Sequence, residues 1–129
     1  MGYDTEFMGA FEIDTKTASP EDVGALASKI NTFKKERHVG DKYPGIWLGW
    51  EVIERPTGSG VPKYYVVWDG IEKFYYYINW LDYLITHYFK PAGMVLNGKV
   101  EYSGYGMGDK GRIVVTANKI KVQTMRYVD

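Results

Sequence analysis

The chain has 129 residues, no cysteine, and sixteen acidic and sixteen basic side chains, so its formal net charge is zero. This length suits one globular domain spanning residues 1–129. The lack of cysteine excludes disulfides, thiol catalysis and thiolate metal sites, and zero net charge argues against nucleic acid or anionic lipid as a general partner. No apolar run approaches the roughly 18 residues of a membrane-spanning helix. We expect a cytoplasmic protein with no membrane contact.

The first predicted element is a half-buried strand. Apolar and polar residues alternate from residue 3 to residue 13, with Phe7, Phe11 and Ile13 on one side and Glu6 and Glu12 on the other. Gly9 interrupts the alternation, which is typical of a bulge or of a close approach by another backbone.

A surface helix follows, starting at the sequence "SPED". Ser19 suits the N-cap, Pro20 suits the first helical position, and the two acids complement the positive end of the helix dipole. Apolar residues then recur at helical spacing to about residue 36 and predict a buried stripe. Its members are Val23, Leu26, Ala27, Ile30 and Phe33.

The middle of the chain predicts two strands and a second helix. The strands cover 46–54 and 63–70, and the Pro- and Gly-rich sequence "RPTGSGVP" predicts a long hairpin connection between them. The helix covers about 72–89 and stops before Pro91.

Two hairpins are predicted near the end of the chain. The first turns at Asn97-Gly98, a pair suited to the two positive φ angles of a tight turn, and the second turns at Ala117-Asn118. The whole pattern predicts a single two-layer α+β domain, with an antiparallel sheet of six or seven strands and two helices.

The second helix is unusual because the stretch "FYYYINWLDYLITHYF" is half aromatic. At 100° per residue one side forms a core face, made of Phe74, Tyr77, Ile78, Leu81, Leu84, Ile85 and Tyr88. A second aromatic stripe lies nearly opposite, made of Tyr76, Trp80, Tyr83 and His87.

Two interpretations of the second stripe remain open from the sequence. Either the first helix or the loop 38–45 covers it, or it is a recognition surface for a partner, since Tyr and Trp dominate binding hot spots. Base stacking is disfavoured because single-strand binders add a positive groove. Here Lys73 and Lys90 are balanced by Glu72 and Asp82.

No motif in the chain predicts a catalytic residue, a metal site or a cofactor. Glycines 106, 108 and 111 match G-x-G-x-x-G, but a predicted strand follows where the dinucleotide fingerprint requires a helix. His38 lies among charges and is expected in a solvated loop. His87 is expected to be partly buried, and neither histidine lies at a helical spacing from the other.

An alternative site of another class is a ligand pocket or hydrolase site between sheet and helices. Its predicted walls are Trp47, Trp50 and Trp68, and its polar groups are Glu51, Asp69 and Glu72. Paired carboxylates can perform acid–base catalysis when they converge in a cleft. A structural role competes for Asp69, which precedes Gly70 and suits a turn or a cap.

Three phrases carry a resemblance to a known group of proteins. They are "YDTEFMGAF", "WDGIEKFYYYINWLDYLITHYFKPAGMVLNGKVEYSG" and "DKGRIVVTANKIKV", which together cover most of the chain. In order and spacing they resemble a family of small proteins encoded by bacteriophages and prophages. The resemblance implies an accessory protein that binds a host protein in the host cytoplasm. It carries over no catalytic or binding residue.

The leading hypothesis is therefore a protein-binding accessory protein without catalysis of its own, with the second aromatic stripe as its contact surface and the 55–62 loop as a secondary element. A homodimer through the same stripe is equally compatible. Ligand binding or hydrolysis ranks second, and nucleic-acid binding third.

Overall fold

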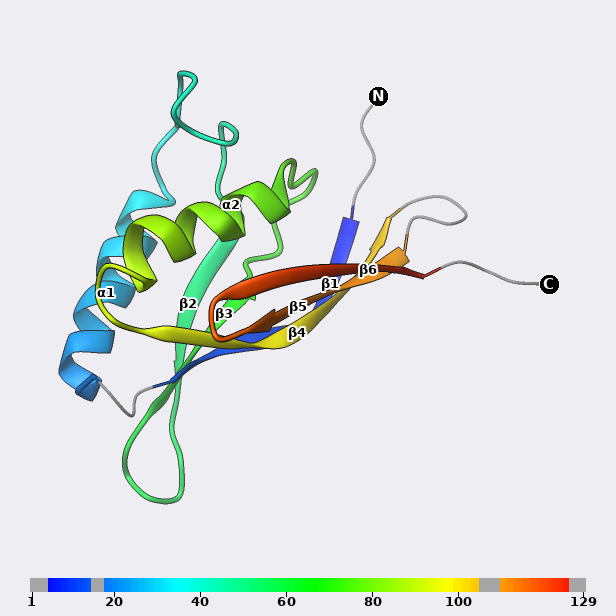
Figure 1. Ribbon diagram of the computed structural model, residues 1–129. Coiled ribbons are helices and arrows are strands. Elements are labelled where there is room, and N and C mark those ends of the chain that lie inside the picture. Colours follow the sequence, from blue (N-terminus) through cyan, green and yellow to red (C-terminus); the bar gives the residue numbers. More distant parts are fainter. Residues whose placement is uncertain (1–4, 15–17, 105–109, 126–129) are drawn as a thin grey trace.

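The protein folds as a single α+β domain with a six-stranded antiparallel sheet and two helices (Figure 1). The computed structural model describes residues 5–14, 18–104 and 110–125. The predicted fold class is confirmed.

The strands are β1 (Thr5–Asp14), β2 (Trp50–Arg55), β3 (Lys63–Trp68), β4 (Val95–Gly104), β5 (Lys110–Thr116) and β6 (Lys119–Met125). They lie in the order β2-β3-β1-β4-β5-β6, with every neighbouring pair antiparallel. The helices are α1 (Pro20–Phe33) and α2 (Tyr77–Leu84), and α2 continues as the π-helical turn η1 (Ile85–Phe89).

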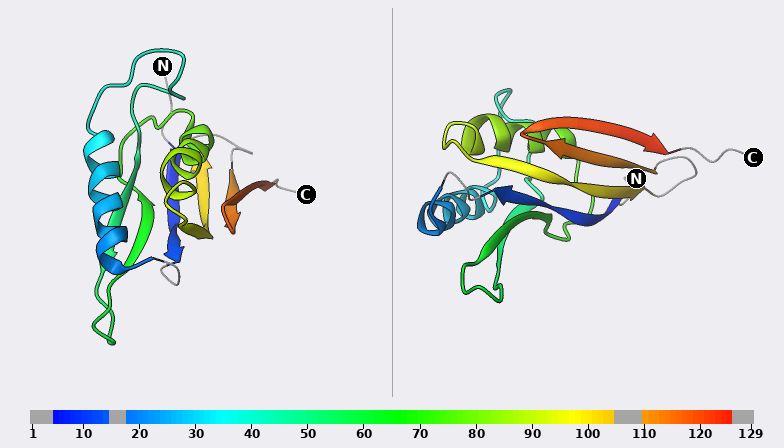
Figure 2. Two further views of the ribbon diagram at one scale, coloured as in Figure 1. Left: turned by 60° about the vertical axis from the view of Figure 1, so that its left-hand side comes forward. Right: turned by 60° about the horizontal axis from the view of Figure 1, so that its bottom comes forward.

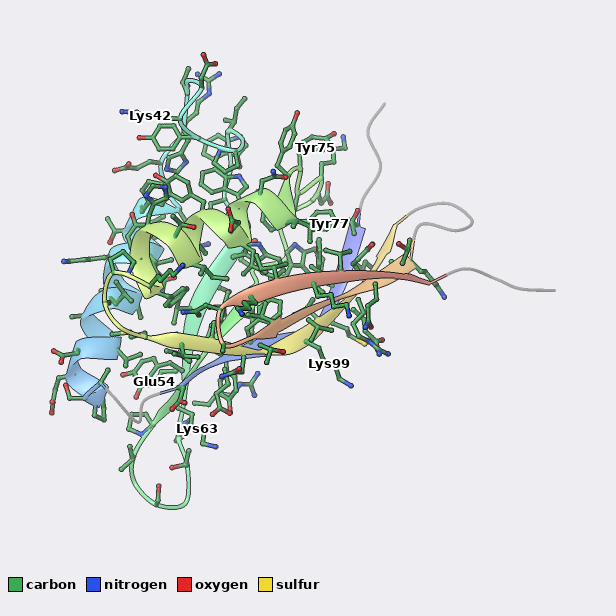
Figure 3. All side chains as sticks on the ribbon, viewed as in Figure 1. Lys42, Glu54, Lys63, Tyr75, Tyr77 and Lys99 are labelled. Atoms are coloured by element: carbon green, nitrogen blue, oxygen red, sulfur yellow. The ribbon has the colours of Figure 1, made fainter. Side chains whose placement is uncertain are left out.

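The helices pack on one side of the sheet and leave the other side open. α1 lies beside β2 and β3, α2 and η1 lie over the middle strands, and β6 forms the far end of the sheet from α1 (Figure 2). The alternation predicted for β1 is confirmed from residue 5 onward, because Phe7, Phe11 and Ile13 face the helices. The opposite face carries charged side chains such as Lys99, which projects away from the helices (Figure 3).

Glycine allows the two longest strands, β1 and β4, to come close together. Gly9 has φ 121°, and a Cβ there would lie 2.5 Å from the carbonyl oxygen of Lys99. Gly98 has φ 146°, and its Cβ would lie 2.5 Å from the carbonyl oxygen of Ala10. Of the bulge and the close approach predicted as alternatives at Gly9, the structure has the close approach, because β1 and β4 pair there in continuous register. The hairpin predicted at Asn97-Gly98 is wrong, because β4 runs straight through both residues and pairs with β1 along its length.

The second predicted hairpin is confirmed, since β5 and β6 turn at Ala117 and Asn118, which have φ 49° and 68°. Asn118 fastens this turn to the start of β4. Its Oδ1 accepts from the N–H of Leu96 at 2.7 Å, and its Nδ2 donates to the carbonyl of Met94 at 2.9 Å. Asn97 accepts from the N–H of Ala117 at 2.8 Å, so Asn97 supports the neighbouring turn and forms none itself.

The α1 helix begins as predicted, because Ser19 accepts from the N–H of Asp22 at 3.1 Å and Pro20 opens the helix. The starts of β2 and α2 each differ from the predictions by several residues. β2 starts at Trp50 and not at 46, since residues 46–49 leave the sheet and Gly49 fits tightly against Ile71 and Phe74.

No helix among residues 5–14, 18–104 and 110–125 is long and apolar enough to cross a membrane.

The second helix starts at Tyr77, five residues later than predicted. Lys73 and Tyr76 take left-handed conformations, with φ 55° and 59°, which a right-handed helix cannot contain. Helical spacing alone predicted an earlier start because Phe74 and Tyr76 fall at helical intervals from the apolar and aromatic residues that follow. The segment 71–76 is instead an irregular loop in front of the helix.

Candidate binding surface

The second aromatic stripe of the helix is divided between core and surface. Trp80 is fully buried, whereas Tyr76 is 62% exposed. Tyr83 is half-buried and His87 is exposed. Trp80 therefore lies in the interior and cannot serve as the contact residue predicted for it.

The end of α1 and the following loop cover Trp80. Its ring lies 6.1 Å from the Phe33 ring and 5.3 Å from the His38 ring, between centroids. Gly45 closes over the indole, since a Cβ at Gly45 would lie 3.2 Å from Nε1. Of the two interpretations left open by the sequence, coverage by the loop 38–45 describes Trp80.

His38 is a core residue, so the solvated loop position predicted for it is wrong. Its backbone N–H donates to the carbonyl of Ile46 at 2.9 Å, and its Nδ1 lies 3.3 Å from the same oxygen. These contacts place the His38 ring between Phe33, Tyr43 and Trp80. Its centroid lies 4.2, 4.9 and 5.3 Å, respectively, from the centroids of their rings. The charged residues on both sides of His38 in the sequence predicted exposure to solvent and did not indicate that the loop would fold back on the core.

Tyr83 packs against this aromatic cluster, with its ring centroid 5.8 Å from that of Phe33 and 5.3 Å from that of Trp80, and His87 lies beside Tyr83 at the margin. Their ring centroids are 4.3 Å apart, and both line a hollow of about 290 Å³ between α2 and the loop residues 41–44. His87 is exposed, whereas a partly buried position was expected. Burial raises the pKa of the Tyr83 phenol above its ordinary value, and the nearby Tyr43 raises it further.

An apolar groove lies beside this cluster, between the loop that precedes β2 and the loop that precedes α2. Its volume is about 320 Å³. Its lining comes from two segments, Gly45, Ile46 and Trp47 on one side, and Ile71, Glu72, Lys73, Tyr75 and Tyr76 on the other. Four of these side chains are large, apolar and close to half exposed or more: Ile46 (46%), Trp47 (48%), Tyr75 (56%) and Tyr76 (62%). We call these four residues the groove surface.

The groove surface points away from the sheet, as the labelled Tyr75 shows in Figure 3. Its second wall is held by hydrogen bonds to β3 and the residue that follows it. Trp68 Nε1 donates to the carbonyl of Ile71 at 3.1 Å, and the N–H of Ile71 donates to Asp69 Oδ1 at 2.9 Å. Asp69 therefore has the turn-forming role expected for it. The first wall is held through His38, which binds the carbonyl of Ile46.

The residues predicted for a pocket between sheet and helices do not converge on one. Trp50 is fully buried in the core, where its Nε1 donates to the carbonyl of Tyr77 at 2.9 Å. Asp69 and Glu51 both lie near Lys34 Nζ, at 2.7 and 3.9 Å, and tie α1 to β2 and β3. Trp68 is half-buried beneath the groove wall. Of the six predicted residues, Trp47 and Glu72 line the groove.

No group of three His, Asp or Glu side chains in the described part of the chain could hold a metal ion. The groove offers one carboxylate and one ammonium group, from Glu72 and Lys73, on otherwise apolar and aromatic walls. Such a lining suits contact with apolar and aromatic groups, with one charge of each sign to orient them.

Sequence reasoning missed Ile46, Ile71 and Tyr75 as residues that line the groove. Ile46 was assigned to a strand and Tyr75 to a helix, because their apolar character fits either periodicity. The available signal was Gly49, inside the predicted strand 46–54, since a glycine inside a predicted strand often marks irregular backbone. No protein-family model, curated protein or solved structure matches this chain.

Proposed function

We propose that this protein is a small accessory protein of the phage-encoded kind, which acts by binding another protein and catalyses no reaction of its own. The groove surface is its contact site. The observation that carries the proposal is the exposure of Trp47, Tyr75 and Tyr76 together around one groove.

Several aromatic side chains exposed together to water are energetically unfavourable, unless a binding partner covers them. Contiguous apolar patches on a protein surface mark interaction sites. Trp and Tyr bury a large area at a small loss of side-chain entropy, and they are enriched in binding hot spots. Because both walls of the groove are hydrogen-bonded to packed elements, the partner would meet a preformed surface.

The partner in this proposal is a host protein. Glu72 and Lys73 at the groove favour a partner segment whose own charges are of both signs around an apolar centre. A second copy of this chain is the alternative protein partner, because aromatic grooves can also pair in symmetric dimers.

A second candidate function is the binding of a small apolar or aromatic molecule. It is favoured by the groove volume of about 320 Å³, which falls within the range of about 300–1,000 Å³ for ligand pockets. Nucleic-acid binding is the third candidate and has the least support, because Lys73 is the single basic side chain among the residues lining the groove.

Site-specific photo-crosslinking tests the proposal. Tyr75 is replaced by p-benzoylphenylalanine, an aromatic residue of similar shape, and the protein is irradiated in nuclease-treated bacterial lysate. Met8, which is exposed on the open face of the sheet, carries the same group in a matched control.

We expect a discrete protein to be crosslinked from position 75 and not from position 8. A crosslinked product made of two copies of this chain would identify self-association through the groove. No product from position 75, or the same products from both positions, would refute the groove surface as a protein contact. Retention of a small molecule by the unirradiated protein would support the second candidate.

A further inference from the structure

The two edges of the sheet differ in how their backbone groups are satisfied. At the β2 edge, Asn31 Nδ2 donates to the carbonyl of Val52 at 2.8 Å, and the N–H of Val52 donates to Asn31 Oδ1 at 2.9 Å. This side chain occupies the position that another strand would take. At the β6 edge, no segment within residues 5–14, 18–104 and 110–125 pairs with the outer side of the strand.

The turn between β5 and β6 determines which backbone groups of β6 face outward. Because the turn has two residues, the flanking residues Thr116 and Lys119 form a hydrogen-bonded pair. Such pairs alternate along β5 and β6 with non-hydrogen-bonded pairs, in which the N–H and C=O groups point away from the neighbouring strand. The N–H and C=O groups of Ile120, Val122 and Thr124 therefore point to the free edge. These three residues can each exchange two hydrogen bonds with an added antiparallel strand.

The side chains at this edge sort by face. Ile120 and Val122 lie opposite Val115 and Ile113, so they face the helix side of the sheet. Val122 is 44% exposed, and the main contacts of α2 and η1 with the sheet lie at β2 and β4. A strand added here would cover this apolar strip with its own apolar residues.

The other face of β6 is basic. Lys119 and Lys121 alternate with Ile120 and Val122 and lie on the open face of the sheet. Within the described residues neither lysine forms an ion pair. The nearby carboxylate of Glu101 pairs instead with Arg112, at 3.2 Å. An incoming strand would meet two positive charges that have no ion-pair partner among the residues that the structure describes.

We propose that the β6 edge binds an extended segment of a partner protein by strand addition, and that acidic and apolar residues alternate in this segment. Its apolar side chains cover Ile120 and Val122, its acidic side chains lie over Lys119 and Lys121, and its backbone bonds to the outward groups of β6. This site is separate from the groove surface and does not depend on it.

The same lysines select against a second copy of this chain. Two β6 strands paired edge to edge would bring four lysines onto one face of the joined sheet, and like charges in adjacent strands destabilise their pairing. Lysine on an edge strand is a known protection against self-association. Charge therefore makes an acidic strand the complementary partner.

The test uses two seven-residue peptides in which Val alternates with Glu or with Lys. Hydrogen exchange of the backbone amides is measured by NMR on the full chain, with each peptide at millimolar concentration. We expect the Glu/Val peptide to slow the exchange of the Ile120, Val122 and Thr124 amides about tenfold, and the Lys/Val peptide to leave them unchanged.

Three variants make the result specific. Lys119→Glu/Lys121→Glu should reverse the preference, so that the Lys/Val peptide protects the three amides. Val122→Pro removes an outward N–H without removing a bond to β5, and should abolish the protection. Trp47→Ala should leave it unchanged, so that failure at this edge is distinguishable from failure of the groove surface.

The proposal is overturned if neither peptide protects the three amides, or if both protect them equally. It is also overturned if protection appears without peptide and grows with protein concentration, because the occupant is then a second copy. If Val122→Pro alters the spectrum of the whole domain, the Lys119→Glu/Lys121→Glu variant provides the test instead. Failure of this variant to reverse the peptide preference would then overturn the proposal.

Discussion

Asn31 and Val52 are joined by two hydrogen bonds, one in each direction, at the outer edge of β2. The amide of Asn31 presents a donor and an acceptor in the geometry of a peptide group, so α1 supplies the hydrogen-bond partners of Val52 at this edge. Exposed strand edges promote aggregation unless they are covered or charged. In this protein Asn31 of α1 occupies the β2 edge at Val52, and two lysines, Lys119 and Lys121, lie on the β6 edge strand.

Replacing Asn31 with Ala should lower the free energy of unfolding by about 1–3 kcal/mol, because the part-buried N–H and C=O of Val52 lose their partners. Urea denaturation measures the change. Thr32→Ala, at an exposed position of the same helix, is the matched control and should change stability by less than about 0.5 kcal/mol. Equal stability of the two variants would contradict the role assigned to Asn31.

Trp80→Ala should lower the free energy of unfolding by about 3–5 kcal/mol, as expected for a fully buried Trp. Tyr76→Ala changes an exposed residue four positions earlier and should cost less than about 1 kcal/mol. Thermal and urea unfolding of both variants check the expectation. A well-folded Trp80→Ala protein of nearly unchanged stability would show that this indole is not part of the core.

Gly98→Ala should destabilise the protein much more than Gly60→Ala. Both glycines have positive φ, 83° at Gly60 and 146° at Gly98, which costs a residue with a Cβ about 1–3 kcal/mol. At Gly60 the added Cβ meets nothing within 4 Å, whereas at Gly98 it would lie 2.5 Å from the carbonyl oxygen of Ala10. The difference between the two unfolding free energies isolates the clash between β1 and β4. Similar losses in the two variants would count against the close approach of these strands.

The free energy of unfolding should fall at alkaline pH because three buried or half-buried tyrosines become ionised there. Burial raises the pKa values of Tyr64, Tyr83 and Tyr88 in the folded state. A phenol with a raised pKa stabilises the fold below its unfolded pKa of about 10, and this contribution is lost as pH rises through the folded pKa. Tyr83→Phe should therefore lose less stability than the wild type above about pH 10. Urea denaturation at a series of pH values measures this, and identical pH dependence in both proteins would contradict it.

Much of the fold could be predicted from the sequence, because local patterns and tertiary packing agree there. The alternation at Phe7, Phe11 and Ile13 fixed the buried face of β1, and Ser19 and Pro20 fixed the start of α1. The turn at Ala117-Asn118 was likewise correct. The pair Asn97-Gly98 misled because a glycine with positive φ suits both a tight turn and a close approach between two paired strands.

The candidate site was less predictable because it depends on contacts between distant segments. Whether Trp80 is exposed depends on how the loop around His38 and Gly45 folds back, and helical spacing holds no information on that. Tyr75 reached the surface because the backbone turns left-handed at Lys73 and Tyr76. Non-glycine residues in this conformation are uncommon and depend on the surrounding structure.

The most direct test of the groove surface is the dissociation constant between the partner identified by crosslinking and three forms of this protein. They are the wild type, Trp47→Ala and the control Met8→Ala. Trp47 is half exposed, so its replacement should leave the fold intact. We expect Trp47→Ala to weaken binding about tenfold or more and Met8→Ala to leave it unchanged. Equal affinity of all three folded forms would contradict the groove surface as the contact site.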